Sequence, residues 1–203
     1  PAALWAMERG KHVYVQKPLT HTVAEARMLT LAAKKYGVAT QMGNQGHSDE
    51  GCRKVCEAVW NGDIGQVYEA HIWTNRPVWP QGIPVPLPEQ PVPDFLDWDL
   101  WLGVAPKRPF GGYYDKKGLA PGQMPVGYAP FAWRGWWDFG CGALGDMACH
   151  IMDAANWALG LGYPTSVEVV KQTANNGQTG PTASVLKYEF PERAVNGVTV
   201  RPV

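Results

Sequence analysis

The sequence lacks an excess of charge of either sign: its 203 residues include 18 basic and 18 acidic side chains, and the formal net charge is zero. It has no basic stripe, which is the electrostatic footprint of proteins that bind nucleic acid. Long apolar runs are also missing, because none approaches the 18 residues that a membrane-spanning helix requires. We therefore expect neither a nucleic-acid partner nor a membrane span.

Cysteine is scarce, and the four that occur are Cys52, Cys56, Cys141 and Cys149. Cys52 and Cys56 are four residues apart, which is not the C-x-x-C spacing of a zinc knuckle or a redox pair. We expect buried or half-buried thiols that behave as small apolar side chains.

Tryptophan and proline, by contrast, are abundant. There are ten tryptophans and 18 prolines, and most of them fall between Trp73 and Trp157. Tryptophan supplies contact area that a disordered segment would not need. This stretch therefore indicates a long folded insert. The hydrophobic content of 45% is enough for a hydrophobic core.

The first part of the chain has the pattern of a strand–helix–strand unit. Residues 11–16 form a short run of β-branched and aromatic side chains, 22–37 are amphipathic and end at a glycine, and 38–44 form the next strand. This order predicts a parallel sheet with a right-handed crossover.

The rest of the chain is richer in strands. Alternation over 66–75 predicts a strand of a sheet with one covered face. The remaining predicted elements are helices at 49–65, 94–103 and 142–160, and strands at 165–173, 183–190 and 195–200 that we place in one antiparallel sheet. The change of pattern near residue 65 predicts two domains.

Two groups of polar residues follow the predicted parallel strands. Gln16 and Lys17 come directly after the first strand, while Asn44, Gln45 and His47 lie among glycines after the second. Ligands of parallel sheets bind beyond the carboxyl ends of the strands. The alternatives are a lysine in solvent and ordinary turn residues.

The run GALGDMACHIMDAANWALG, residues 142–160, places Asp146, His150 and Asp153 close together. At about 100° per residue they fall at about 0°, 40° and 340° on one helical face, which Trp157 continues. Three interpretations remain open: a solvated polar stripe, a carboxylate–imidazole pair for acid/base catalysis, and a metal site.

Taken together, HVYVQKPLTH, GNQGHS and GCGALGDMACHIMDAANWALG resemble the Gfo/Idh/MocA oxidoreductases, and the long aromatic insert resembles a bacterial branch with sugar-related substrates. The resemblance covers essentially the whole chain. It implies an α/β plus α+β fold: the C-terminal part of a Rossmann dinucleotide-binding domain over 1–48, followed at 49–203 by an open, mostly antiparallel sheet domain with helices on one face. The chain is then expected to be an internal fragment, with the pyrophosphate-binding turn and any export signal upstream.

The resemblance also implies roles for single residues. Lys17, Asp146 and His150 would be catalytic, with His150 as the acid/base. Gln16, Lys17, Asn44, Trp133 and Arg134 would lie by NAD or NADP, and His47 would join Lys17, Asp146 and His150 around the substrate. The family usually has Glu before Lys-Pro, and here that position is Gln16, which removes a negative charge beside Lys17. No resident metal is expected.

The expected function is hydride transfer between the nicotinamide and a hydroxyl or carbonyl group of a sugar, polyol or glycoside. The alternatives are cleavage of a glycoside through transient sugar oxidation and sugar binding without catalysis on the same fold. Tryptophans of the insert would either pack the insert or stack on a sugar. The resemblance further implies a homodimer or tetramer. Location in the cytoplasm or export to the periplasm depends on sequence upstream and is not decided by these residues.

Overall fold

The computed structural model describes residues 1–83, 85–111, 127–195 and 198–200. The chain divides into two compact units. Unit 1 comprises residues 1–73, 147–166 and 188–203, and unit 2 comprises residues 74–146 and 167–187. The predicted boundary after residue 48 stays a prediction, because a spatial grouping of this kind does not test it.

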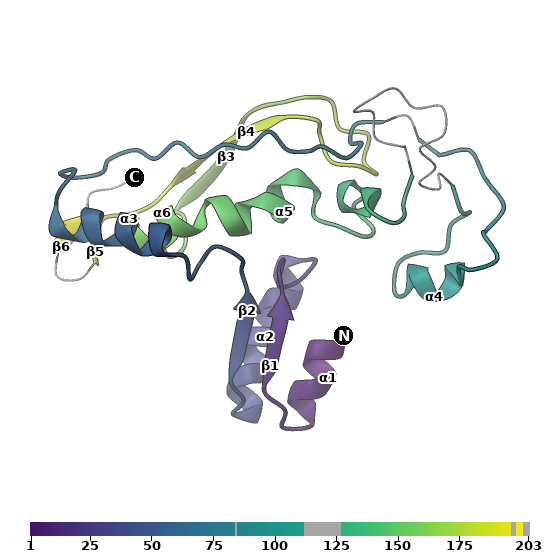
Figure 1. Ribbon diagram of the computed structural model, residues 1–203, viewed down its shortest axis with the longest axis horizontal. Coiled ribbons are helices and arrows are strands. Elements are labelled where there is room, and N and C mark those ends of the chain that lie inside the picture. Colours follow the sequence, from purple (N-terminus) through teal and green to yellow (C-terminus); the bar gives the residue numbers. More distant parts are fainter. Residues whose placement is uncertain (84, 112–126, 196–197, 201–203) are drawn as a thin grey trace. The chain divides into compact units, whose positions relative to one another are not determined.

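Unit 1 begins with the predicted strand–helix–strand unit. The helix α1 (Ala2–Glu8) precedes β1 (Val13–Gln16), α2 (Val23–Tyr36) and β2 (Thr40–Gly43). The strands β1 and β2 pair in parallel, from Val13 opposite Thr40 to Gln16 opposite Gly43, which confirms the prediction (Figure 1). Their carboxyl ends therefore lie at one edge of the sheet.

The helix α2 is delimited by its own sequence. The Thr22 hydroxyl accepts a hydrogen bond from the Glu25 backbone N–H, and the Glu25 carboxylate accepts one from the Thr22 N–H, which completes a capping box. The helix ends at Gly37, whose φ of 63° places it in the left-handed region. Both ends are thus specified locally.

The rest of unit 1 is built around α3 (Glu50–Asn61) and α6 (Asp153–Leu159), which pack together. The Trp60 indole N–H donates to the Ala158 carbonyl at 2.9 Å. Buried side chains of Leu159, Leu161 and Phe190 form a small core beside them. The strands β5 (Arg193–Val195) and β6 (Val198–Val200) complete the unit as an antiparallel pair.

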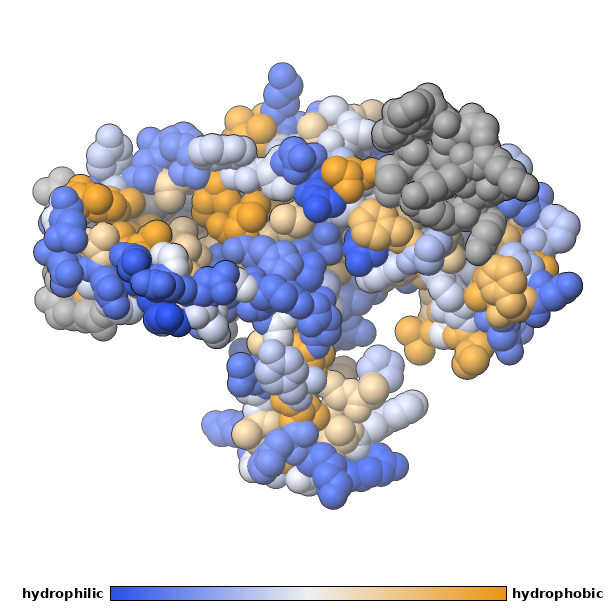
Figure 2. Space-filling view, viewed as in Figure 1, coloured by the Kyte–Doolittle hydropathy of each residue, from blue (hydrophilic) through white to orange (hydrophobic). Residues whose placement is uncertain are grey.

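Unit 2 has an aromatic core. Trp98 and Leu102 of α4 (Trp98–Leu102) are buried against Phe110, Tyr128 and Trp136, the last of which follows the 3₁₀ helix η1 (Ala132–Gly135). This packing confirms that tryptophans of the insert hold the insert together. Leu100 of α4 and its sequence neighbours Phe95 and Val104 remain exposed, and Figure 2 shows apolar surface over this segment.

Gln81 is the polar counterpart of this core. Its amide nitrogen donates to the Pro181 carbonyl at 2.6 Å. Its amide oxygen accepts from the Trp79 indole at 2.9 Å and from the Ala143 backbone N–H at 3.0 Å. One buried side chain therefore links three segments of unit 2, including the start of α5 (Gly142–Ile151).

Three predictions about secondary structure are wrong: the strand at 66–75, the single helix at 142–160 and the single sheet of the later strands. Residues 66–75 form no strand, because no strand in the described part of the chain pairs with them and alternation alone supplies no ladder. The helix predicted at 142–160 is two helices, α5 and α6, that are separated at Met152.

The later strands do not form one sheet among the described residues. The strand β3 (Ser166–Gln172) pairs with β4 (Ser184–Glu189), and β5 pairs with β6, so that each sheet has two strands. The predicted strand 195–200 is shared between β5 and β6, and its residues 196 and 197 lie outside the described residues. Mixed helices and small sheets nevertheless confirm the α/β class.

Candidate functional site

The ends of β1 and β2 bring two of the predicted polar groups together. Gln16 is the last residue of β1, and Asn44 follows the last residue of β2. The amide nitrogen of Gln45 donates to the side-chain oxygen of Gln16 at 3.4 Å. Lys17 follows Gln16, and its peptide bond to Pro18 is cis. Polar side chains after the two parallel strands therefore meet at one sheet edge, as the sequence predicts.

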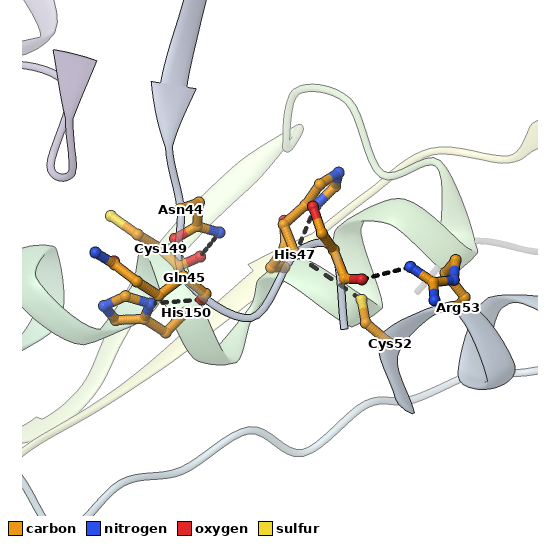
Figure 3. A network of polar contacts seen from close by, with 9 residues as sticks. Asn44, Gln45, His47, Cys52, Arg53, Cys149 and His150 are labelled. Carbon is orange, nitrogen blue, oxygen red and sulfur yellow. Dashed lines mark hydrogen bonds and ion pairs between the residues drawn. The ribbon is translucent and has the colours of Figure 1, made fainter. Parts of the chain in front are cut away.

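The loop after β2 is also fastened to α5. The Asn44 side chain donates from its nitrogen to the Cys149 carbonyl at 2.6 Å, and the His150 ring lies 3.1 Å from the Gln45 carbonyl oxygen (Figure 3). These contacts join residues 105 apart in the sequence. They place His150 beside the carboxyl end of β2.

The contact with Gln45 determines which nitrogen of His150 carries the proton in the neutral ring. A backbone carbonyl only accepts hydrogen bonds, so Nδ1 must be the donor. The other nitrogen, Nε2, then has a free lone pair. A neutral imidazole in this tautomer can accept a proton from a hydroxyl group through Nε2.

A second histidine of the same loop is paired with a carboxylate. His47 Nδ1 lies 2.8 Å from Asp153 Oδ2, at the start of α6. The His47 ring stacks on Trp157, with 4.6 Å between ring centroids and an interplanar angle of 24°. The sequence placed Asp153 beside His150 on one helical face. In the structure the helix breaks before Asp153, and the carboxylate contacts His47 instead.

Two cysteines of α3 lie near this pair. The Cys52 thiol is 3.9 Å from Asp153 Oδ2, and Cys56 is buried behind it. Burial, and then the negative charge of Asp153, raise the pKa of Cys52, while burial is the main cause of the raised pKa of Cys56. Thiols with raised pKa values are poor nucleophiles. All four cysteines of the chain are thiols, as predicted.

The remaining predicted residues lie in unit 2. The Arg134 guanidinium is 3.7 Å from Asp146 Oδ1, and Nη1 donates to the Phe131 carbonyl at 3.1 Å. The same guanidinium lies over the rings of Trp133 and Phe131, at 4.7 and 4.4 Å from their centroids. Arg134 and Asp146 thus form a half-buried ion pair that is packed on aromatic rings.

The predicted residues are distributed over both units, and Asp146 and His150 share α5. Unit 1 contains Gln16, Lys17, Asn44, His47 and His150, whereas unit 2 contains Trp133, Arg134 and Asp146. Sequence reasoning named Gln45 for its polar side chain and missed its carbonyl, because a backbone carbonyl leaves no signal in residue type. Among the described residues, no group of three or more His, Cys, Asp or Glu side chains is arranged to hold a metal ion.

Comparison with known families gives one match. Residues 73–190, more than half of the chain, match the family described as the oxidoreductase family, C-terminal alpha/beta domain. This range includes Trp133, Arg134, Asp146 and His150. No curated protein matches the chain. In the described part of the chain, no helix has the length and apolar character needed to cross a membrane.

Proposed function

Because the chain belongs to the Gfo/Idh/MocA family of oxidoreductases, we propose that it transfers a hydride between NAD or NADP and a hydroxyl or carbonyl carbon of a sugar, polyol or glycoside. The family generally uses NAD or NADP, which carries the hydride when bound. This chain's share of the reaction is to place the reacting carbon and to move the proton.

The edge of the β1–β2 sheet fits a nicotinamide. Asn44 Oδ1 is buried and has no hydrogen-bond partner, and an unpaired buried acceptor is costly. The carboxamide N–H of a nicotinamide is a donor that would satisfy it. Asn44, Gln16 and Lys17 would then hold the ring at the end of the parallel strands, where such sheets bind nucleotides.

His150 would serve as the acid/base. In the oxidative direction, Nε2 accepts the proton of the substrate hydroxyl while the carbon loses its hydride, and the ring becomes an imidazolium. In reduction the same nitrogen returns the proton. The Gln45 carbonyl is the observation that supports this role most directly, because it keeps the proton on Nδ1 and leaves Nε2 as the base.

The other residues would assist substrate binding. Lys17 would offer its ammonium group to the substrate oxygen, and His47 would contact the substrate from the loop after β2. Asp146 would bind a substrate hydroxyl, and its ion pair with Arg134 would orient the carboxylate. Trp133 and Arg134 would lie by the cofactor, as the family resemblance implies.

We also propose that copies of the chain pair through the β3–β4 sheet. This sheet exposes Val167, Val169 and Val170 of β3 and Val185 of β4. Neighbouring residues of a strand point to opposite faces, so apolar side chains are exposed on both faces of β3. Exposed apolar side chains of this kind support an interface between copies.

The test measures hydride transfer by the full-length protein with a panel of sugars and polyols. The change in nicotinamide absorbance is the readout. His150→Ala should lower kcat by about 10²- to 10⁴-fold, the usual contribution of a positioned acid/base. Lys17→Ala should also lower turnover. His71→Ala removes an exposed imidazole that pairs with Glu69 and serves as the matched control. Unchanged turnover in both His150→Ala and Lys17→Ala would refute the assignment.

A further inference from the structure

The loop Asn44–Asp49 makes three side-chain contacts with the helices α5 and α6. The Asn44 side chain bonds to the Cys149 carbonyl, the Gln45 carbonyl accepts from His150, and His47 bonds to Asp153 (Figure 3). Two of these contacts reach α5, and the third reaches the first residue of α6. The loop and the helix break at Met152 are therefore joined by side chains.

The contact between His47 and Asp153 is the strongest of the three. It is a contact of 2.8 Å between the His47 ring, whose side chain is 48% exposed, and a carboxylate whose side chain is 18% exposed. Hydrogen bonds to ionised groups are stronger than those between neutral groups. The His47 ring is also stacked on Trp157, and Trp157 meets Trp60 of α3 edge-on at 6.3 Å. The hydrogen bond and the ring stack together orient the His47 side chain.

The loop is short, so fixing His47 also fixes the backbone two residues earlier. Gln45 has an exposed side chain and a 3.4 Å contact with Gln16, which is a weak anchor. The place of its carbonyl oxygen is then set mainly by the bonded residues on either side, Asn44 and His47. That oxygen is the acceptor that selects the tautomer of His150.

We propose that Asp153 and His47 are a positioning pair for His150: they hold the loop after β2 so that the Gln45 carbonyl keeps the His150 proton on Nδ1. The catalytic consequence rests on the proposed function, while the effect on the tautomer does not. The charged or titratable groups nearby are Cys52 and Cys56 of α3, with Asp49 and Arg53 at its start.

The experiment measures the tautomer of His150 directly, by ¹⁵N NMR of the imidazole nitrogens in the full-length protein without substrate. Asp153→Ala removes the anchor of His47. Asp153→Asn keeps an oxygen that can accept from Nδ1–H and removes only the charge. Glu50→Gln is the matched control, because it changes an exposed carboxylate of α3 that pairs with Lys54. Backbone amide spectra establish that each variant is folded.

In the wild type and in Glu50→Gln, His150 should show an N–H at Nδ1 and an unprotonated Nε2. Asp153→Ala should produce a mixture of tautomers, and kcat should fall about 10- to 100-fold, as small misplacements of catalytic groups do. Asp153→Asn should restore the wild-type tautomer and most of kcat.

An unchanged His150 tautomer in folded Asp153→Ala would overturn the positioning pair, even if kcat fell. A changed tautomer in a protein whose wild type transfers no hydride would support the positioning pair and refute the proposed function. The two claims therefore fail separately.

Discussion

Each of the two units is stabilised by a different kind of internal contact. In unit 2, ring packing dominates: Trp98 stacks on Trp101 and Tyr128 and meets Phe110 edge-on. In unit 1, the portion from α1 to β2 has few buried side chains, Met7 and Ala32 among them. The loop after β2 is held by hydrogen bonds to α5 and α6.

Ring packing and hydrogen bonding have different physical effects. Aromatic side chains bury large areas and stabilise a segment with little regular secondary structure, but ring packing does not select a protonation state. Hydrogen bonds contribute less net stability, yet they fix the direction of a donor and hence a tautomer. The proposed acid/base accordingly lies in the unit that uses hydrogen bonds.

The largest expected effect on stability is in the aromatic core of unit 2. Trp136 is 1% exposed, and its indole N–H donates to the Gly127 carbonyl at 2.9 Å. Trp136→Ala should lower the free energy of unfolding by about 3–5 kcal/mol, through lost burial and a cavity. Urea unfolding would measure it. Trp73, which is 81% exposed, is the control, and an equal loss in Trp73→Ala would contradict the comparison.

The next effect is at the polar link of unit 2. Gln81→Ala leaves the Trp79 indole and the Ala143 N–H without their acceptor, and the Pro181 carbonyl without its donor. Because a buried polar group left unpaired costs about 1–3 kcal/mol, urea unfolding should show a loss of that order. Gln178→Ala, at an exposed position, should change little. No loss in Gln81→Ala would show that ring packing alone holds the unit.

A smaller effect is expected in unit 1, at the start of α2. Thr22→Ala removes the side-chain cap of the Glu25 N–H and should cost about 1 kcal/mol. Thr22→Ser keeps the hydroxyl and should recover most of this loss. Hydrogen exchange of the first turn of α2 would report the change. Equal exchange rates in Thr22→Ala and Thr22→Ser would show that the cap contributes nothing.

The smallest effect is the response of the same cap to acid. The backbone N–H of Thr22, followed by that of His21, holds the pKa of Glu25 below its ordinary value of 4.5. The contribution of this carboxylate is therefore present above pH 4.5 and is lost as the pH falls through the lower folded value. Glu25→Gln should flatten this part of the stability curve in urea unfolding between pH 7 and pH 3. A steeper loss of stability with falling pH in Glu25→Gln than in the wild type would contradict this prediction.

Much of the local structure could be read from the sequence. The start of α2 at Thr22, its end at Gly37 and the parallel pairing of β1 with β2 follow from signals within a few residues of each element. The strand predicted at 66–75 failed because a strand also needs a partner, which alternation does not provide.

The candidate site was also predictable only in part, because a sequence pattern does not show which residues become partners in the folded chain. Residue type and the family resemblance predict that His150, Lys17 and Asp146 carry chemistry, and this stays a prediction. They did not identify the contact made by the Gln45 carbonyl, because every residue has a backbone carbonyl. They also did not identify the helix break at Met152, because helical periodicity continues through it.

The sequence by itself determined the ends of α2 and the strand–helix–strand unit, since these depend on neighbours along the chain. Only the tertiary structure decided which carboxylate meets which imidazole. His47 and Asp153 are 106 residues apart, and His150 and Gln45 are 105 apart. Hydrogen bonds act over about 3 Å of space and carry no record of sequence separation, so the partners are fixed only when the chain has folded.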